Sequence, residues 1–123
     1  MGMVSTQRGR MAEDAAAWYL RGRGWHILDR NRRTPVGELD LVCREGEAVV
    51  MVEVKARSGN LYGEALESVG PRKERRLRAA AGWWAAEHGG EFRLRFDVVV
   101  VALLPDGSLH SLAHIRDVFG NRG

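Results

Sequence analysis

The chain has 123 residues, 45% of them hydrophobic, so it is long enough for one ordinary domain with a single core and too short for two. Its 19 basic and 16 acidic residues give a net charge of +3, which is weak support for a polyanionic partner. No apolar run is long enough for a membrane span or a secretory signal, and the single cysteine cannot form an internal disulfide. We therefore expect a soluble cytoplasmic protein and no membrane partner.

The first part of the chain predicts one helix followed by a short extended segment. Hydrophobic residues at helical spacing, with glycines beyond them, predict a helix over 9–23. Residues 25–30 are interpreted as a short strand or the approach to one. The Asn, Pro and Gly of 31–37 predict a turn.

Strand-like runs and a second helix fill most of the remaining chain. Two runs rich in apolar residues, 38–43 and 48–56, predict a hairpin, and the polar segment 57–70 predicts a loop. A second helix is expected over 71–88, because a proline opens this stretch and two glycines follow it. The most apolar stretch, 92–104, predicts a central strand.

The last segment, 108–119, fits either a strand or a short helix. Taken in chain order, the elements predict an α/β sandwich around a mixed sheet. We expect a single domain over 1–123 with flexible ends at 1–8 and 120–123.

The predicted hairpin carries charged residues inside its two strands. A turn on 46–47, with glycine in its first position as a type II′ hairpin prefers, pairs Asp40 with Glu53 and Glu38 with Lys55 on one face. The opposite face is apolar and pairs Leu39 with Val54, Leu41 with Val52 and Cys43 with Val50. A turn one residue earlier would leave the two central acids diagonal to each other, still on one face.

Two carboxylates that face each other at about 5 Å repel, which destabilises a sheet unless a cation lies between them. One interpretation is a solvated polar face with cross-strand ion pairs. The other is a cation site, because Mg²⁺ prefers hard carboxylate ligands with room for water. Val42 and Met51, which flank the acids on the same face, indicate partial burial and favour the cation site.

These residues carry a family resemblance. Asp40 followed by Glu53-Val54-Lys55 resembles the D…(D/E)-x-K signature of the restriction-endonuclease-like, or PD-(D/E)XK, superfamily. The surrounding stretches resemble the YraN family of small bacterial proteins, relatives of archaeal Holliday-junction resolvases. The matching residues are those of 37–41 and 51–57, Gly9 through Glu13, Leu20, Gly24, Asn31, Lys73, Leu77, Arg95 through Asp97, His114 and Ile115.

The resemblance implies a restriction-endonuclease-like sandwich, a mixed central sheet flanked by helices, that hydrolyses DNA with Mg²⁺, for which Mn²⁺ can substitute. It implies that Asp40, Glu53 and the main-chain carbonyl of Val54 are metal ligands. Lys55 would orient or activate the attacking water, and Glu13 would join the catalytic site. The substrate stays open between a junction, a flap, a single strand and RNA, and junction cleavage would favour a homodimer.

A cluster of bases near the start of the second predicted helix lies where the helix dipole disfavours positive charge. This placement favours phosphate binding, and a solvated basic face is the alternative. The residues that we expect to grip nucleic-acid backbone are Arg32, Arg33, Arg57, Arg72, Lys73 and Arg76.

Two functions compete with a nuclease. One is a nucleic-acid-binding module that retains the nuclease fold without turnover, and the other is an interaction protein that presents tryptophans to a partner. Among the remaining residues, we expect Trp84 in the core and Cys43 on the apolar face. Arg95 and Asp97 share a strand face and are expected to pair in a structural role.

Overall fold

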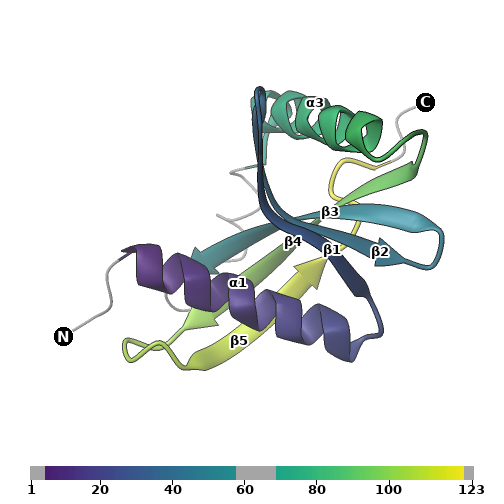
Figure 1. Cartoon of the computed structure of the whole chain (residues 1–123). Helices are drawn as coiled ribbons and strands as arrows, with labels where there is room; N and C mark the ends of the chain where they lie inside the picture. Colours follow the sequence, from purple (N-terminus) through teal and green to yellow (C-terminus); the bar gives the residue numbers. More distant parts are fainter. Residues whose placement is uncertain (1–4, 58–68, 121–123) are drawn as a thin grey trace.

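The computed structural model of the protein describes residues 5–57 and 69–120 (Figure 1). Its elements, in chain order, are α1 (Ser5–Gly22), β1 (His26–Thr34), β2 (Gly37–Glu45), β3 (Ala48–Arg57), α3 (Pro71–Glu87), β4 (Arg93–Leu103) and β5 (Leu109–Ile115). Most of the predicted loop at 57–70, and parts of the predicted flexible ends at 1–8 and 120–123, lie outside the described residues. No described helix is long and apolar enough to cross a membrane.

The five strands form one mixed sheet in the order β1-β2-β3-β4-β5. Neighbouring strands are antiparallel except for β3 and β4, which are parallel and are connected through α3. A parallel pair requires such a crossover, whereas antiparallel neighbours can follow each other through short turns. The predicted α/β class and mixed sheet are confirmed.

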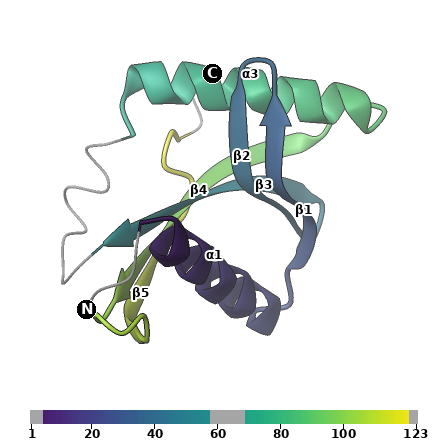
Figure 2. The same cartoon turned by 60° about the vertical axis from the view of Figure 1, so that its left-hand side comes forward.

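The two described helices, α1 and α3, cover opposite faces of the sheet (Figures 1 and 2). On one face α1 contributes Ala12, Ala16 and Leu20, which pack against strand residues such as Val50 and Val99. Small residues on this helix let it approach the sheet closely, and each fully buried Val or Leu contributes about 1.5–3 kcal/mol. The sandwich is consistent with a restriction-endonuclease-like fold.

On the other face, α3 packs Leu77, Ala80 and Trp84 against Val42 and Met51. Trp84 is 2% exposed, as expected for a core residue, and its indole nitrogen donates a hydrogen bond to Asp29 at 3.3 Å. The two sheet residues that appeared to flank a polar face are therefore covered by a helix. This makes the second face of the hairpin largely apolar and leaves its acids partly enclosed.

The hairpin register is as predicted where the two strands pair. Leu41 lies opposite Val52 and Cys43 opposite Val50, and Gly46 takes a φ of 58° in the turn. A positive φ suits glycine at the first central position of a type II′ turn.

One detail of the predicted hairpin is wrong. Leu39 does not continue the face of Leu41, because it packs in the cluster beneath α3. Figure 2 shows the cause: the end of the sheet formed by β1 and β2 bends toward α3. The pairing of β2 with β3 accordingly extends from Glu45 and Ala48 only as far as Leu41 and Val52.

Two boundaries also differ from the predicted ones. The helix predicted from Gly9 begins at Ser5, so described residues of the predicted flexible end form its first turns. The guanidinium of Arg8 donates a 3.5 Å hydrogen bond to the carbonyl of Leu103, which ties this turn to β4. Apolar spacing could not extend the helix that far, because the apolar pattern starts only at Met11.

The turn predicted over 31–37 is mostly strand. β1 continues to Thr34 and pairs Arg32 with Leu39, so only Pro35 and Val36 remain in the turn. Asn31 adopts a positive φ of 50° within β1, and pairing with β2 overrides the turn propensity of the Asn, Pro and Gly in this segment. The unassigned segment 108–119 supplies the edge strand β5.

A buried polar network supports the sheet through β4 and β5. Asp97, which is 0% exposed, accepts hydrogen bonds from Arg95 at 2.9 Å and from His114 at 2.8 Å, which confirms the expected pair. Tyr19 on α1 bonds the other ring nitrogen of His114 at 3.0 Å. Cys43 is buried, and burial raises the pKa of its thiol to about 12, so the thiolate is strongly disfavoured.

Candidate active site

The predicted catalytic residues gather where β2 and β3 stop pairing. Asp40 directly precedes Leu41, the residue at which the pairing of β2 with β3 ends. Its carboxylate accepts a hydrogen bond from the main-chain N–H of Val54 at 2.9 Å. The side chain of Asp40 thus bonds a main-chain N–H of β3 at the point where β2 and β3 stop pairing. This bond fixes Asp40 beside the stretch of β3 that carries Glu53 and Lys55.

Glu53 lies between two ammonium groups. Its Oε1 is 3.1 Å from the Nζ of Lys73 on α3 and 3.4 Å from the Nζ of Lys55 on its own strand. Glu53 is only 8% exposed, so a charged form needs these partners. The sequence predicted Lys55 beside the acids, but it placed Lys73 only among the nucleic-acid contacts.

Asp40 has the most unusual electrostatic environment of the site. Burial raises the pKa of its carboxyl group to about 7, and the negative charge of Glu53 is the next largest cause. The hydrogen bond from Val54 partly offsets the rise, while the charges of Glu13 and Glu38 add to it. Three acidic side chains therefore act on the carboxyl group of Asp40, and a cation beside it would relieve this repulsion.

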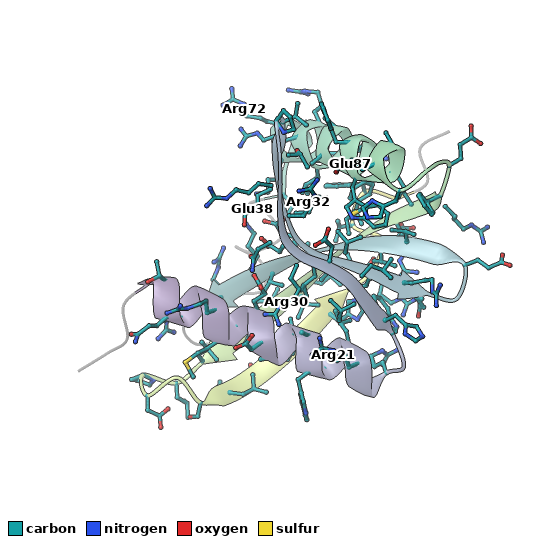
Figure 3. The ribbon with its side chains drawn as sticks, viewed as in Figure 1. Arg21, Arg30, Arg32, Glu38, Arg72 and Glu87 are labelled. Atoms are coloured by element: carbon teal, nitrogen blue, oxygen red, sulfur yellow. The ribbon has the colours of Figure 1, made fainter. Side chains whose placement is uncertain are left out.

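Glu13 reaches the site from α1. It is 9% exposed, and its Oε1 accepts hydrogen bonds from Arg30 at 3.0 Å and from Asn31 at 2.8 Å. Figure 3 shows Arg30 beside α1, where it also pairs with Asp14 at 2.7 Å. Glu13, the fourth predicted catalytic residue, therefore lines the same pocket as Asp40, and its Oε1 is bonded to two side chains of β1.

Two adjoining pockets meet at Glu38 and Asp40, which line both. The larger, about 570 Å³, is bounded by the start of α1 and by β1, β2 and Val54. The smaller, about 240 Å³, lies toward α3 and is lined by Glu53 and Lys73 among others. Glu38 and Asp40 thus lie between the two pockets, one on the α1 side and the other on the α3 side.

The donors present fit a magnesium ion with few protein ligands. Among the described residues, no group of three or more His, Cys, Asp or Glu side chains is close enough to form a metal cluster of that kind. Mg²⁺ does not need one, because it is usually held by one or two carboxylates and keeps several waters. Asp40 and Glu53, with the carbonyl of Val54, would supply that type of site, and a bound cation would lower the pKa of Asp40, which burial and the charge of Glu53 raise.

The predicted nucleic-acid contacts divide into two groups. Arg33 lines the larger pocket, and Lys73 and Arg76 line the smaller, so three of them border the acids. Arg32 instead forms ion pairs with Glu87 on α3 and with Asp29 on its own strand, and Figure 3 shows Arg32 and Glu87 side by side.

Arg57 and Arg72 lie outside the lining of both pockets. Arg57 ends β3 and donates a hydrogen bond to the carbonyl of Ala56 at 2.8 Å. Arg72 is exposed in the first turn of α3. Among the described residues, neither Arg57 nor Arg72 forms an ion pair, and their predicted role in binding nucleic acid stays a prediction.

Sequence reasoning missed Arg10, an exposed base that lines the larger pocket together with Glu13. The signal was available in the spacing, because residues three apart on a helix share a face. Arg10 and Arg33 give the α1 side a basic wall that mirrors Lys73 and Arg76 on the α3 side.

Comparison with known proteins identifies the relationship that the motif indicated. The sequence model of the family described as "Uncharacterised protein family UPF0102" matches residues 12–101. The chain belongs to the UPF0102 family. This is the YraN family named above on its motifs, and the matched span contains Glu13, Asp40, Glu53 and Lys55.

Members of the UPF0102 family resemble this chain over most of its length. A UPF0102 protein of Anaeromyxobacter dehalogenans is 55% identical over 94 residues, 76% of this chain and 70% of the relative. One from Frankia casuarinae is 48% identical over 112 residues, 90% of this chain and 94% of the relative. One from Pelotomaculum thermopropionicum is 45% identical over 112 residues, 90% of this chain and 93% of the relative.

Proposed function

We propose that this protein is a metal-dependent nuclease that hydrolyses phosphodiester bonds of DNA between its two pockets. The observation that carries the proposal is the pair of acids at the point where β2 and β3 diverge. Asp40 has a pKa raised to about 7 by burial and by neighbouring acids, and Glu53 lies beside it with two lysines. Such an arrangement lowers stability unless a cation binds there, which supports a metal site.

In this proposal Asp40, Glu53 and the carbonyl of Val54 hold the ion. When bound, Mg²⁺ supplies positive charge to the phosphate and acidifies an attacking water. Lys55 keeps a second positive charge within reach of Glu53 and of the reacting phosphate, where it orients the nucleophile. No covalent intermediate with the protein is required.

Bases on both sides of the acids support a nucleic-acid substrate. Arg10 and Arg33 on the α1 side, and Lys73 and Arg76 on the α3 side, can bind phosphates on either side of the bond that is cut. Phosphate contacts position a strand without reading its bases, so the substrate would be selected by its shape. A branched DNA such as a four-way junction or flap is the class that we propose to test first.

The test is cleavage of labelled single-stranded, duplex, flap and four-way-junction DNA with Mg²⁺ or Mn²⁺. Wild type is compared with Asp40→Asn, Glu53→Gln and Lys55→Met, and Glu91→Gln serves as a control in an exposed acid between α3 and β4. We expect metal-dependent cutting that falls by about 100-fold or more in the three site variants and persists in the control. Tight DNA binding with no cutting by wild type would instead favour a binding module that retains the fold.

A further inference from the structure

Lys73 is joined to the site through Glu53, although it comes from a different layer of the molecule. Its Nζ is 3.1 Å from Oε1 of Glu53, closer than the 3.4 Å of Lys55. It projects from the first turn of α3, one helical turn before the buried Leu77. The base of this side chain is therefore fixed by helix packing, and only its flexible end can move.

The two lysines on Glu53 differ in their freedom. The side chain of Lys55 is 18% exposed and lies on β3, whereas that of Lys73 is 32% exposed and lines the smaller pocket. A lysine ammonium is a compact charge on a flexible stem, so Lys73 can turn from Glu53 into this pocket. The pocket has a volume of about 240 Å³, enough for about eight waters at the density of the liquid.

A divalent ion and Lys73 compete for the same carboxylate. The ion pair occupies one oxygen of Glu53, and a cation held by Glu53 and Asp40 would repel a nearby ammonium. An ammonium driven away from Glu53 lies in a pocket whose other base is Arg76. The same pocket is lined by Glu38, Asp40 and Glu53, and once a metal neutralises Asp40 and Glu53 the two bases outnumber the one remaining acid and form an attractive position for a phosphate.

We propose that Lys73 is a counter-ion of Glu53 that a divalent metal displaces, and that the displaced ammonium then binds a phosphate of the nucleic acid. This proposal rests on the proposed metal site. It makes metal binding and nucleic-acid binding mutually reinforcing through one side chain. Such coupling must be reciprocal at equilibrium, so it can be measured from either ligand.

The test measures Ca²⁺ binding from the rise in melting temperature without DNA, and then binding of a labelled four-way junction by fluorescence anisotropy in EDTA and in Ca²⁺. The variants are Lys73→Met, Lys73→Gln and the charge-conserving Lys73→Arg. Arg76→Met is the matched control, because it removes one positive charge from the same pocket, and among the described ion pairs of Glu53 the partners are lysines.

We expect Lys73→Met and Lys73→Gln to lower the half-saturating Ca²⁺ concentration by about three- to tenfold, because a competing charge is removed. The same variants should lose about three- to tenfold of the gain in DNA affinity that Ca²⁺ gives wild type. Lys73→Arg should remain within about twofold of wild type in both assays, and Arg76→Met should weaken DNA binding with a smaller change in the Ca²⁺ midpoint.

Tighter Ca²⁺ binding together with a smaller Ca²⁺-dependent gain in DNA affinity separates this role of Lys73 from a structural one. An unchanged or higher Ca²⁺ midpoint in Lys73→Met and Lys73→Gln, while wild type responds to Ca²⁺, would overturn the role of Lys73 and leave the metal site standing. No response to Ca²⁺ in wild type, or an equal response in Asp40→Asn, would overturn the metal site and with it the displacement.

Discussion

Asp40 illustrates how a single side chain can oppose the stability of the fold that holds it. Its pKa of about 7 means that the folded state retains a proton which the unfolded chain, with an ordinary aspartate, releases near pH 4. The contribution of this group to stability is therefore present at low pH and is lost as pH rises from about 4 to about 7. Residues that lower stability in this way are concentrated at functional sites.

The Asp40→Asn variant should consequently be more stable than wild type at about pH 8 in EDTA, by about 1–2 kcal/mol after allowance for partial exposure. The amide removes the charge while its oxygen can still accept the N–H of Val54. Urea unfolding of both proteins measures the difference. A less stable variant would show that the hydrogen bond from Val54 to the carboxylate stabilises the fold more than burial and repulsion of its charge destabilise it.

Asp97 shows the opposite balance. Burial alone would raise its pKa, but hydrogen bonds from His114, Arg95 and the main chain of Asp117 outweigh burial and hold the pKa at about 2. The stability that this group contributes is present above its unfolded pKa and is lost as pH falls from about 4 to about 2.

Asp97→Asn should lower the free energy of unfolding by about 3–5 kcal/mol near neutral pH, because Arg95 loses a buried partner. It should also flatten the acid limb of the stability curve between about pH 4 and pH 2. Unfolding by urea across that pH range measures both effects. Equal acid sensitivity in the variant and in wild type would assign the loss to other carboxyl groups.

At the scale of elements, the bend of the β1–β2 hairpin decides where the acids lie. β2 begins at Gly37, whose φ of 153° would strain any other residue. A Cβ atom added at Gly37 would lie 3.5 Å from the Cγ of Arg76 on α3. The hydroxyl of Thr34 donates a 2.7 Å hydrogen bond to the carbonyl of Gly37 across the turn. The close approach of this turn to α3 fixes the orientation of Glu38 and Asp40.

Gly37→Ala should therefore destabilise the protein by about 1–3 kcal/mol through backbone strain. Gly82→Ala is the matched control, because Gly82 lies in α3 with open space beside it. This substitution should raise the free energy of unfolding by about 0.5–1 kcal/mol. Thermal unfolding of the two variants checks the signs. Equal effects would mean that the conformation at Gly37 carries no cost.

The elements also show how far the sequence could predict the structure. The hairpin register followed from turn chemistry and alternation, both of which are local. The bend that separates Leu39 from Leu41 depends on contacts with α3, which lies more than thirty residues later in the chain. The same limit explains the turn predicted over 31–37, where pairing with β2 produced a strand.

The candidate site was predictable in type more than in detail. Asp40, Glu53 and Lys55 could be grouped because one hairpin carries them, and Glu13 because of a family resemblance. The contact of Lys73 with Glu53 and the position of Arg10 depend on how two helices pack on opposite faces of the sheet. The pairing of Arg32 with Glu87 likewise arises only from packing between β1 and α3.

For the whole molecule, the modest net charge of +3 conceals a local concentration of bases around the two pockets. Four of them, Arg10, Arg33, Lys73 and Arg76, surround the acids. If each contacts one phosphate of a duplex arm, the logarithm of DNA affinity should fall with the logarithm of salt concentration with a slope of about −3 to −4.

Replacing Arg33 and Arg76 together by glutamine should reduce that slope by about 2 and weaken binding to all DNA sequences alike. A salt series of binding isotherms on duplexes of different sequence measures both quantities. Arg44→Gln with Arg93→Gln is a control of equal charge, because these exposed bases lie outside the lining of the two pockets. An equal loss in both pairs would indicate that net charge alone governs binding.

Divalent-metal binding by Asp40 and Glu53 underlies both the proposed nuclease activity and the proposed displacement of Lys73. Isothermal titration calorimetry with Mn²⁺ at about pH 6.5, in buffers of different ionisation enthalpy, tests it most directly, because a metal that binds Asp40 must displace its proton. We predict saturable binding whose heat depends on the buffer in wild type, with that dependence absent in Asp40→Asn. Heats that show no saturation, or that are the same in the variant, would show that Asp40 does not bind the metal.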